Sequence, residues 1–395
     1  MESYEFLMLV AIILLSTKVF GLLSEKVHMP QVVGALLVGV ILGPSCFNIL
    51  HETDFLVKSA EIGVIFLMFM AGLDTDLEEL KSTGKASFVI ALIGVIVPLI
   101  GGFATYYVFF GKTVPADKAV LESVFIGVVL TATSVSITVE TLREMGKLKG
   151  KVGTSILGAA IIDDILGIIA LTVITSFADP DVNIIFVLLK IILFFAFVVI
   201  CAVIIHKVFQ KMEQKYGRKR RVAIYAVAFC FFMSYCAEEF FGVADITGAY
   251  FAGLILCNIS DTKSYIASKV TVTSYMFFTP IFFASIGIKT VVTGLTPTLI
   301  VFSIVLLIVA IITKIVGCGI GALICKFDRH EALSVGIGMV SRGEVALIVA
   351  QKGAQVGLIS ETMFPAIVVV VIVTTLITPI LLKMTMADKK VAKEA

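Results

Sequence analysis

Apolar residues occur along the chain in long runs that short polar or Pro/Gly segments separate. About 20 apolar residues are enough to cross a bilayer as a helix. The pattern therefore predicts thirteen membrane-spanning helices at 4–23, 31–50, 58–75, 86–111, 119–142, 152–177, 183–206, 221–237, 242–258, 270–292, 297–325, 331–353 and 360–384. The expected fold class is an all-α polytopic membrane protein.

The composition supports this prediction, because 59% of the 395 residues are hydrophobic and only 15% are charged. Soluble domains contain about a quarter charged residues. A soluble enzyme, a nucleic-acid binder and a disordered scaffold are therefore excluded. The four histidines lie at segment ends, and the seven cysteines form no C-x-x-C pair, so we expect neither a cofactor nor a structural metal centre.

Basic residues are unevenly distributed between the two faces that thirteen spans define. Twenty-two lysines and arginines fall in the loops of one face, and five fall on the other, namely Lys58, Lys112, Lys118, Lys289 and Lys352. The positive-inside rule makes the richer face cytoplasmic. We therefore expect a multi-pass plasma-membrane protein with its N-terminus outside, its first span retained and its C-terminus in the cytoplasm.

Two segment pairs indicate an internal repeat. VGALLVGVILGP at 33–44 resembles TGAYFAGLILCN at 247–258, and FMAGLDTDL at 69–77 resembles FASIGIKTV at 283–291. The offset between the copies equals seven predicted helices, an odd number, so the second copy enters the membrane inverted. Inverted repeats are typical of secondary transporters, although a helical bundle without repeats remains an alternative.

The repeat divides the chain into three parts. Residues 1–177 form the first inverted repeat, in which 86–177 are core helices that follow scaffold helices. Residues 178–220 are a linker helix and a basic cytoplasmic loop. Residues 221–395 form the second repeat, with core helices at 297–385.

Five charged residues lie near the centres of predicted spans: Asp163, Asp164, Lys314, Arg342 and Glu344. Each costs about 3 kcal/mol in the bilayer centre without a partner. Three acids face two bases, so one carboxylate is left to bind a proton or a metal cation. Oxygen ligands suit hard cations, so a proton and a cation compete for the same carboxylate. This competition is the minimal chemistry of cation/proton exchange. Buried structural salt bridges are the alternative.

A helix break is predicted at LTATSVSIT, residues 130–138, because hydroxyl groups can replace lost backbone hydrogen bonds. The repeat-related span carries SRGE at 341–344. Two facing half-helices would present carbonyl groups and helix ends to the site, and Arg342 and Glu344 would neutralise those ends. Close packing of small residues is the alternative.

These motifs together resemble the monovalent cation:proton antiporter superfamily, in its NapA/NhaA-like and Kef-related branch of bacterial Na⁺/H⁺ antiporters. The resemblance covers GALLVGVILGPS, FMAGLDTDL, the TATS break, the DD pair, the membrane lysine and RGEVALIVA. It implies two inverted repeats that form an ion-carrying core and a flatter scaffold, and a homodimer formed through that scaffold.

The resemblance also implies roles for individual residues. Asp164 would be the main ligand of Na⁺ and of the proton, and Asp163, a weaker Na⁺ ligand, would form an ion pair with Lys314 that opens as protons exchange. Thr131 and Thr133 would approach the ion at the break. Paired aspartates are typical of electrogenic members, so Asp163 places the chain among them.

The expected function is electrogenic Na⁺(Li⁺)/H⁺ antiport by alternating access, which serves pH homeostasis in a bacterial plasma membrane. The expected partners are a monovalent cation, a proton and membrane lipid, and nucleic acid is not among them. We expect no enzyme activity. A Kef-type K⁺/H⁺ antiporter is the nearest alternative. An intramembrane aspartyl protease, which needs carboxylates from two helices, and a cation channel are remote ones.

Overall fold

The computed structural model describes residues 4–27, 29–112, 115–178, 184–216, 220–258, 260–289, 296–355, 358–359 and 363–386. The first half contains α1 (Glu5–Lys26), α2 (Gln31–Leu42), α3 (Asp54–Asp74), α4 (Leu77–Phe110), α5 (Ala116–Thr131), α6 (Val135–Glu144), α7 (Lys151–Ala178) and α8 (Ile184–Tyr216). The second contains α9 (Arg220–Phe241), α10 (Asp245–Leu256), α11 (Ser260–Thr273), the π-helix η1 (Ser274–Phe278), α12 (Thr279–Ile288), α13 (Pro297–Ile324), α14 (Arg329–Gly338), α15 (Glu344–Gln355) and α16 (Phe364–Met386).

The described residues form helices and no strand, which confirms the all-helical prediction. Ten helical segments among them are long and apolar enough to cross a membrane. Two further apolar helices, α2 and α10, have 12 residues each and are shorter than a bilayer core is thick.

Most predicted ranges coincide with helices, and the differences have local causes. The range 31–50 is too long: α2 ends at Leu42 because Gly43 is extended and the next residue, Pro44, has no amide hydrogen to continue the helix. The ranges 119–142 and 331–353 each contain two helices that a short non-helical segment separates, in agreement with the breaks predicted at 130–138 and 341–344.

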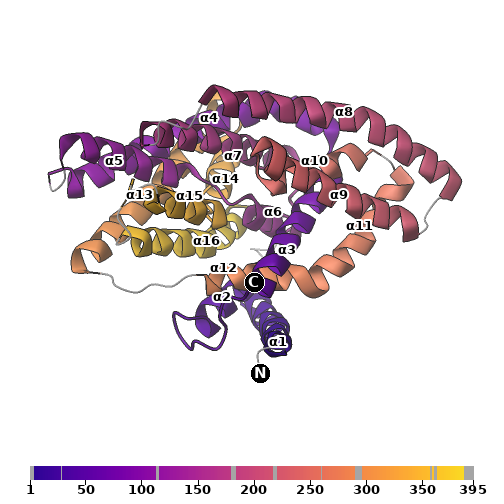
Figure 1. Ribbon diagram of the computed structural model, residues 1–395, viewed down its shortest axis with the longest axis horizontal. Helices are drawn as coiled ribbons and strands as arrows, with labels where there is room; N and C mark the ends of the chain where they lie inside the picture. The colour runs from indigo at the N-terminus through magenta and orange to yellow at the C-terminus, as the bar shows by residue number, and fades with distance from the viewer. Residues whose placement is uncertain are drawn as a thin grey trace.

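The helices gather into two groups that meet at α6 (Figure 1). One group contains α4, α5, α7 and α13 to α16, and α8 to α11 lie on the other side. A cluster of buried side chains joins α5, α13, α15 and α16. A larger cluster joins α1 to α3 with α8 to α12 and reaches α6 and α7.

Glycines allow the short helices to lie against their neighbours at backbone distance. A Cβ atom added to Gly39 of α2 would come within 2.0 Å of the Ala284 carbonyl oxygen in α12. One added to Gly253 of α10 would come within 2.2 Å of the Phe69 carbonyl oxygen in α3. Small residues of this kind drive close packing between membrane helices.

The first prediction concerns the contact between α2 and α12. Gly39→Ala should lower the thermal unfolding midpoint of the purified protein in detergent, because overpacking a close contact costs about 1–3 kcal/mol. Gly84→Ala is the matched control. Gly84 lies in α4 with no atom within 4 Å of an added Cβ, so the control should be neutral or slightly stabilising. Equal unfolding midpoints for the two variants would contradict the close contact between α2 and α12.

Candidate functional site

The break in the predicted span 119–142 lies at Ala132–Ser134. Helix α5 ends at Thr131, Ser134 has extended backbone angles, and α6 begins at Val135. The amide of Ser134 donates to the carbonyl oxygen of Ser341 at 2.7 Å instead of to its own helix. A backbone donor that the break removes from the helix is thus satisfied by the other broken span.

Residues 339–343 form the second break, between α14 and α15, and it lies against the first. The Thr133 hydroxyl donates to the Met339 carbonyl oxygen at 3.5 Å, and the Thr138 hydroxyl donates to that of Gly338 at 2.7 Å. A Cβ atom at Gly343 would lie 2.6 Å from Ser134 Oγ, so only glycine fits there without a shift of the serine. The two breaks therefore cross each other.

Arg342 lies at this crossing and is only 1% exposed. Its guanidinium donates to the carbonyl oxygen of Leu130 at 2.6 Å and to that of Val340 at 2.9 Å, with a longer contact of 3.3 Å to that of Ala310 in α13. Leu130 is in the last turn of α5, where carbonyl groups carry a partial negative charge that a cation stabilises. Arg342 therefore neutralises a helix end, and the side chain of Glu344 lies outside the described residues.

Lys314 and Asp163 form an ion pair in the interior. Lys314 Nζ lies 2.9 Å from Asp163 Oδ1, and both side chains are 0% exposed. The ammonium also donates to the Gly94 carbonyl oxygen in α4 at 3.0 Å. In a regular helix this carbonyl would accept from residue 98, which is Pro98 and has no amide hydrogen. The proline thus leaves an acceptor for the lysine.

The remaining predicted residues differ in how they approach this pair. Thr133 lies beside the Asp163 carboxylate, whereas the Thr131 hydroxyl donates to the Val128 carbonyl oxygen of its own helix at 2.7 Å. Asp164 follows Asp163 on α7 and is 8% exposed. Because successive helical residues point about 100° apart, Asp164 and Asp163 face different surroundings. The structure brings Asp163, Lys314, Thr133 and Arg342 together.

One buried charge was missed by the sequence analysis. Glu140 in α6 is 2% exposed, and the Tyr275 hydroxyl lies 2.6 Å from both of its carboxylate oxygens. The available signal was an acidic residue inside the predicted span 119–142. Its position near the end of that span made it look like a boundary residue.

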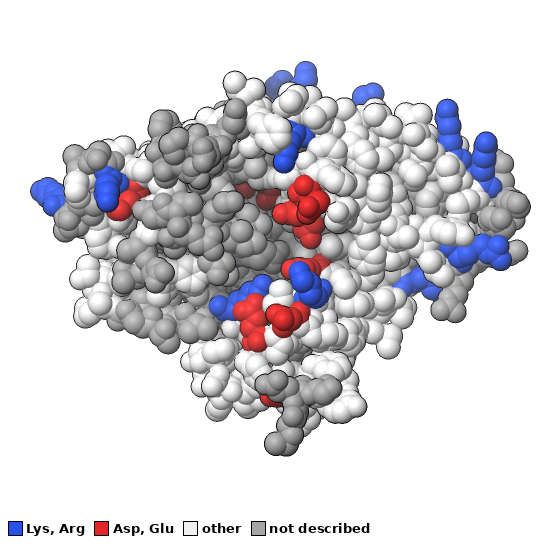
Figure 2. Space-filling view, viewed as in Figure 1, with Lys and Arg blue, Asp and Glu red and all other residues white. Residues whose placement is uncertain are grey.

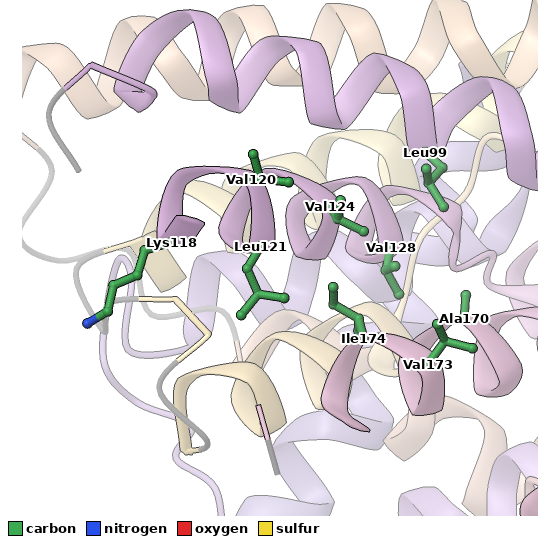
Figure 3. A pocket seen from close by; sticks show the side chains of 9 residues that line it. All are labelled: Leu99, Lys118, Val120, Leu121, Val124, Val128, Ala170, Val173 and Ile174. Carbon is green, nitrogen blue, oxygen red and sulfur yellow. The ribbon is translucent and has the colours of Figure 1, made fainter. Parts of the chain in front are cut away.

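Two cavities lie near these helices. One of about 560 Å³ is lined by residues of α1, α2, α6, η1 and α12, which include Glu140, Glu144 and Tyr275. The other, of about 520 Å³, lies among α4, α5 and α7. Figure 3 shows that Leu99, Val128 and other apolar side chains line it, with the Lys118 ammonium directed away. Among the side chains that the structure describes there, the lining offers no carboxylate for a cation.

Comparisons with known proteins find a matching family and several transporters that the chain resembles. The family described as sodium/hydrogen exchanger, transmembrane, matches residues 10–387. The Na⁺/H⁺-K⁺ antiporter GerN of Bacillus cereus is 40% identical over 100% of this chain and 99% of its own length. A Na⁺/H⁺ antiporter of Enterococcus hirae is 35% identical over 96% of this chain and 97% of its own.

A solved structure supports the fold. That of the sodium proton antiporter MjNhaP1 from Methanocaldococcus jannaschii matches with a TM-score of 0.70 at 18% identity. The match covers 95% of this chain and 96% of the other. The named relatives are transporters and not enzymes.

Proposed function

Because the chain belongs to the sodium/hydrogen exchanger family, we propose that it exchanges Na⁺ or Li⁺ for H⁺ by alternating access in a bacterial plasma membrane. The observation that carries this proposal is the buried Lys314–Asp163 pair beside Asp164 and the crossing helix breaks. A site of this kind can hold a proton or a cation on its oxygens and excludes the two together. The distribution of basic loops supports an orientation with the N-terminus outside and the C-terminus in the cytoplasm.

In this mechanism Asp164 is the principal carboxylate for the cation and the proton. Deprotonated Asp164 takes up Na⁺ from one face, with Thr133 and carbonyl groups of the break as neutral oxygen ligands. Asp163 releases Lys314 as protons exchange and re-forms the pair afterwards. The distance of 2.9 Å between Lys314 Nζ and Asp163 Oδ1 supports such an exchange. A buried ammonium needs a counter-charge or must lose its proton, so the protonation of Lys314 is linked to that of Asp163.

The proposed exchange is electrogenic, with more protons than sodium ions moved per cycle. Two adjacent aspartates and one lysine can together release more than one proton when a single cation binds. Movement of a net charge across the membrane couples the cycle to the potential at about 2.3 kcal/mol per charge and 100 mV.

We further propose two inverted repeats, 1–177 and 221–395, with the linker at 178–220. The glycine contacts support them: Gly39 packs on Gly287 and Gly253 packs on Gly72, and the repeat relates each of these contacts to the other. The core would comprise 86–177 and 297–385. The remaining helices would form the scaffold and the contact surface of a homodimer.

A second cation deserves a test because the printed name of GerN includes K⁺. Selectivity between Na⁺ and K⁺ depends on the size of the oxygen cage, and a Kef-type K⁺/H⁺ exchanger would use the same charged residues. Potassium therefore stands as the alternative substrate.

The second prediction concerns the transported ion. In proteoliposomes that contain a pH-sensitive dye, added Na⁺ and Li⁺ should drive proton efflux, and K⁺ at equal concentration should drive much less. The same panel is run with and without a membrane potential. A response to K⁺ alone would replace sodium with potassium as the substrate, and no response to any cation would refute antiport.

The third prediction concerns Asp164. Asp164→Asn keeps the size of the side chain but removes its titratable oxygen, so Na⁺-driven proton flux should fall to the level of empty liposomes. Asp54→Asn, at an exposed position at the start of α3, is the matched control and should retain the wild-type rate. Wild-type flux in Asp164→Asn would remove Asp164 from the site.

The fourth prediction concerns Lys314. Lys314→Gln removes the cation that leaves Asp163 during exchange, so residual flux should lose its dependence on the membrane potential. Lys190→Gln, which changes a lysine within α8 that lies over the Phe186 ring, is the control and should keep that dependence. Full voltage dependence in Lys314→Gln would exclude the lysine from the proton pathway.

A further inference from the structure

One face of α6 carries three charged residues that each contact a different neighbouring element. Glu140, Arg143 and Glu144 are spaced i, i+3 and i+4 and thus lie on one side of the helix. Glu140 contacts Tyr275 of η1, Arg143 forms an ion pair with Asp74 at the end of α3, and Glu144 contacts the start of α2. Elements of both proposed scaffold halves therefore hold a single core helix.

The contact between Glu140 and Tyr275 is the most buried of the three. The phenol hydroxyl lies 2.6 Å from Oε1 and 2.6 Å from Oε2. Glu140 is 2% exposed, and a hydrogen bond to a buried carboxylate is stronger than one between neutral groups. Tyr275 belongs to a π-helical segment, and such segments frequently mark functional sites within helices.

The other two contacts close the same boundary nearer the protein surface. The Glu144 carboxylate accepts from the amides of Gln31 at 2.7 Å and Val32 at 3.2 Å. These are the first two residues of α2, where a carboxylate stabilises the positive end of the helix dipole. Arg143 and Asp74 are 19% and 29% exposed, so solvent weakens their ion pair.

The surroundings of these contacts are not closely packed. The cavity of about 560 Å³ has Glu140, Glu144 and Tyr275 in its lining and extends from the start of α2 to Leu14 in the middle of α1. Figure 2 shows acidic side chains gathered near the middle of one face, between the two groups of helices. Polar contacts across a hollow can break without the loss of an apolar core.

Helix α6 connects this boundary to the ion site. It begins at Val135, directly after Thr133 and Ser134 of the crossing, and ends at Glu144. Its ten residues span about 15 Å. A change in how its far end is held is therefore transmitted to the break beside Asp163.

We propose that Glu140 and Tyr275 form a latch that holds the core against the scaffold in the conformation described here, and that its release is a step of transport. The inference rests on the proposed antiport by alternating access. Both residues act as positioning residues, because neither contacts Asp163 or Lys314. The cavity is lined by Glu144, the last residue of α6, and so lies at the end of α6 that leads into the basic loop 145–150. In this proposal the conformation described here is the one open to that face.

Release of the latch should change the fraction of protein in the conformation described here. An apparent affinity falls in proportion to the fraction of protein in the competent conformation. Release of the latch should raise the apparent KM for Na⁺ at the basic-loop face and lower it at the opposite face. A hydrogen bond to a charged group is strong enough for the ratio of the two KM values to change about tenfold.

The fifth prediction tests the latch with Tyr275→Phe, which removes the donor and keeps the ring. Sodium-driven proton flux is measured in inside-out and right-side-out vesicles from cells that lack other sodium antiporters. Tyr225→Phe, at an exposed position on α9, is the matched control and should show the wild-type ratio of KM values. A changed ratio with opposite shifts at the two faces supports the latch.

An unchanged ratio in Tyr275→Phe, or an equal rise of KM at both faces, would overturn the latch. Glu140→Gln provides a second measurement, and the double variant should shift the ratio no further than the larger single change, because both remove the same contact. Additive shifts would show that the residues act separately. Failure of antiport itself is distinguishable, since the wild-type vesicles would then show no Na⁺-driven flux.

Discussion

A lysine ammonium without water around it persists only where an anion and a backbone acceptor are held beside it, and this constraint organises the core. Asp163 supplies the anion and Gly94 the carbonyl oxygen for Lys314. The three residues belong to α7, α4 and α13, so the packing of these helices is fixed by one buried charge. Removal of either partner from a buried pair leaves a charge that the interior cannot solvate.

The crossing of the two broken spans obeys the same rule for backbone groups. A break inside a membrane frees donors and acceptors that lipid cannot satisfy. Here the Ser134 amide donates to Ser341, the Thr138 hydroxyl donates to Gly338, and Arg342 donates to the last turn of α5. Each break therefore supplies partners to the other, and the crossing is stable only as a pair.

The sequence predicted the helices and the positions of both breaks because apolar run length and hydroxyl content are local properties. It also identified Lys314 and the aspartates, since a charge in an apolar run is conspicuous. The role of Pro98 was not predicted, because a proline in a span by itself indicates only a kink. Its role depends on the Gly94 carbonyl oxygen, which it leaves free to accept a hydrogen bond from Lys314. Glu140 was missed because its burial depends on Tyr275, which is 135 residues away.

Helix α6 joins the two constraints. Its first turn follows the break beside the ion pair, and its last turns are held by Tyr275, Asp74 and the start of α2. A ten-residue helix is too short to bend appreciably, since helices curve over radii of about 60–100 Å. In the proposed transport cycle, movement of the core past the scaffold would therefore break the contacts at one end of α6 or disturb the crossing at the other. The contacts at the scaffold end border a cavity, whereas those at the crossing lie against the buried ion pair, so the proposed cycle releases the scaffold end.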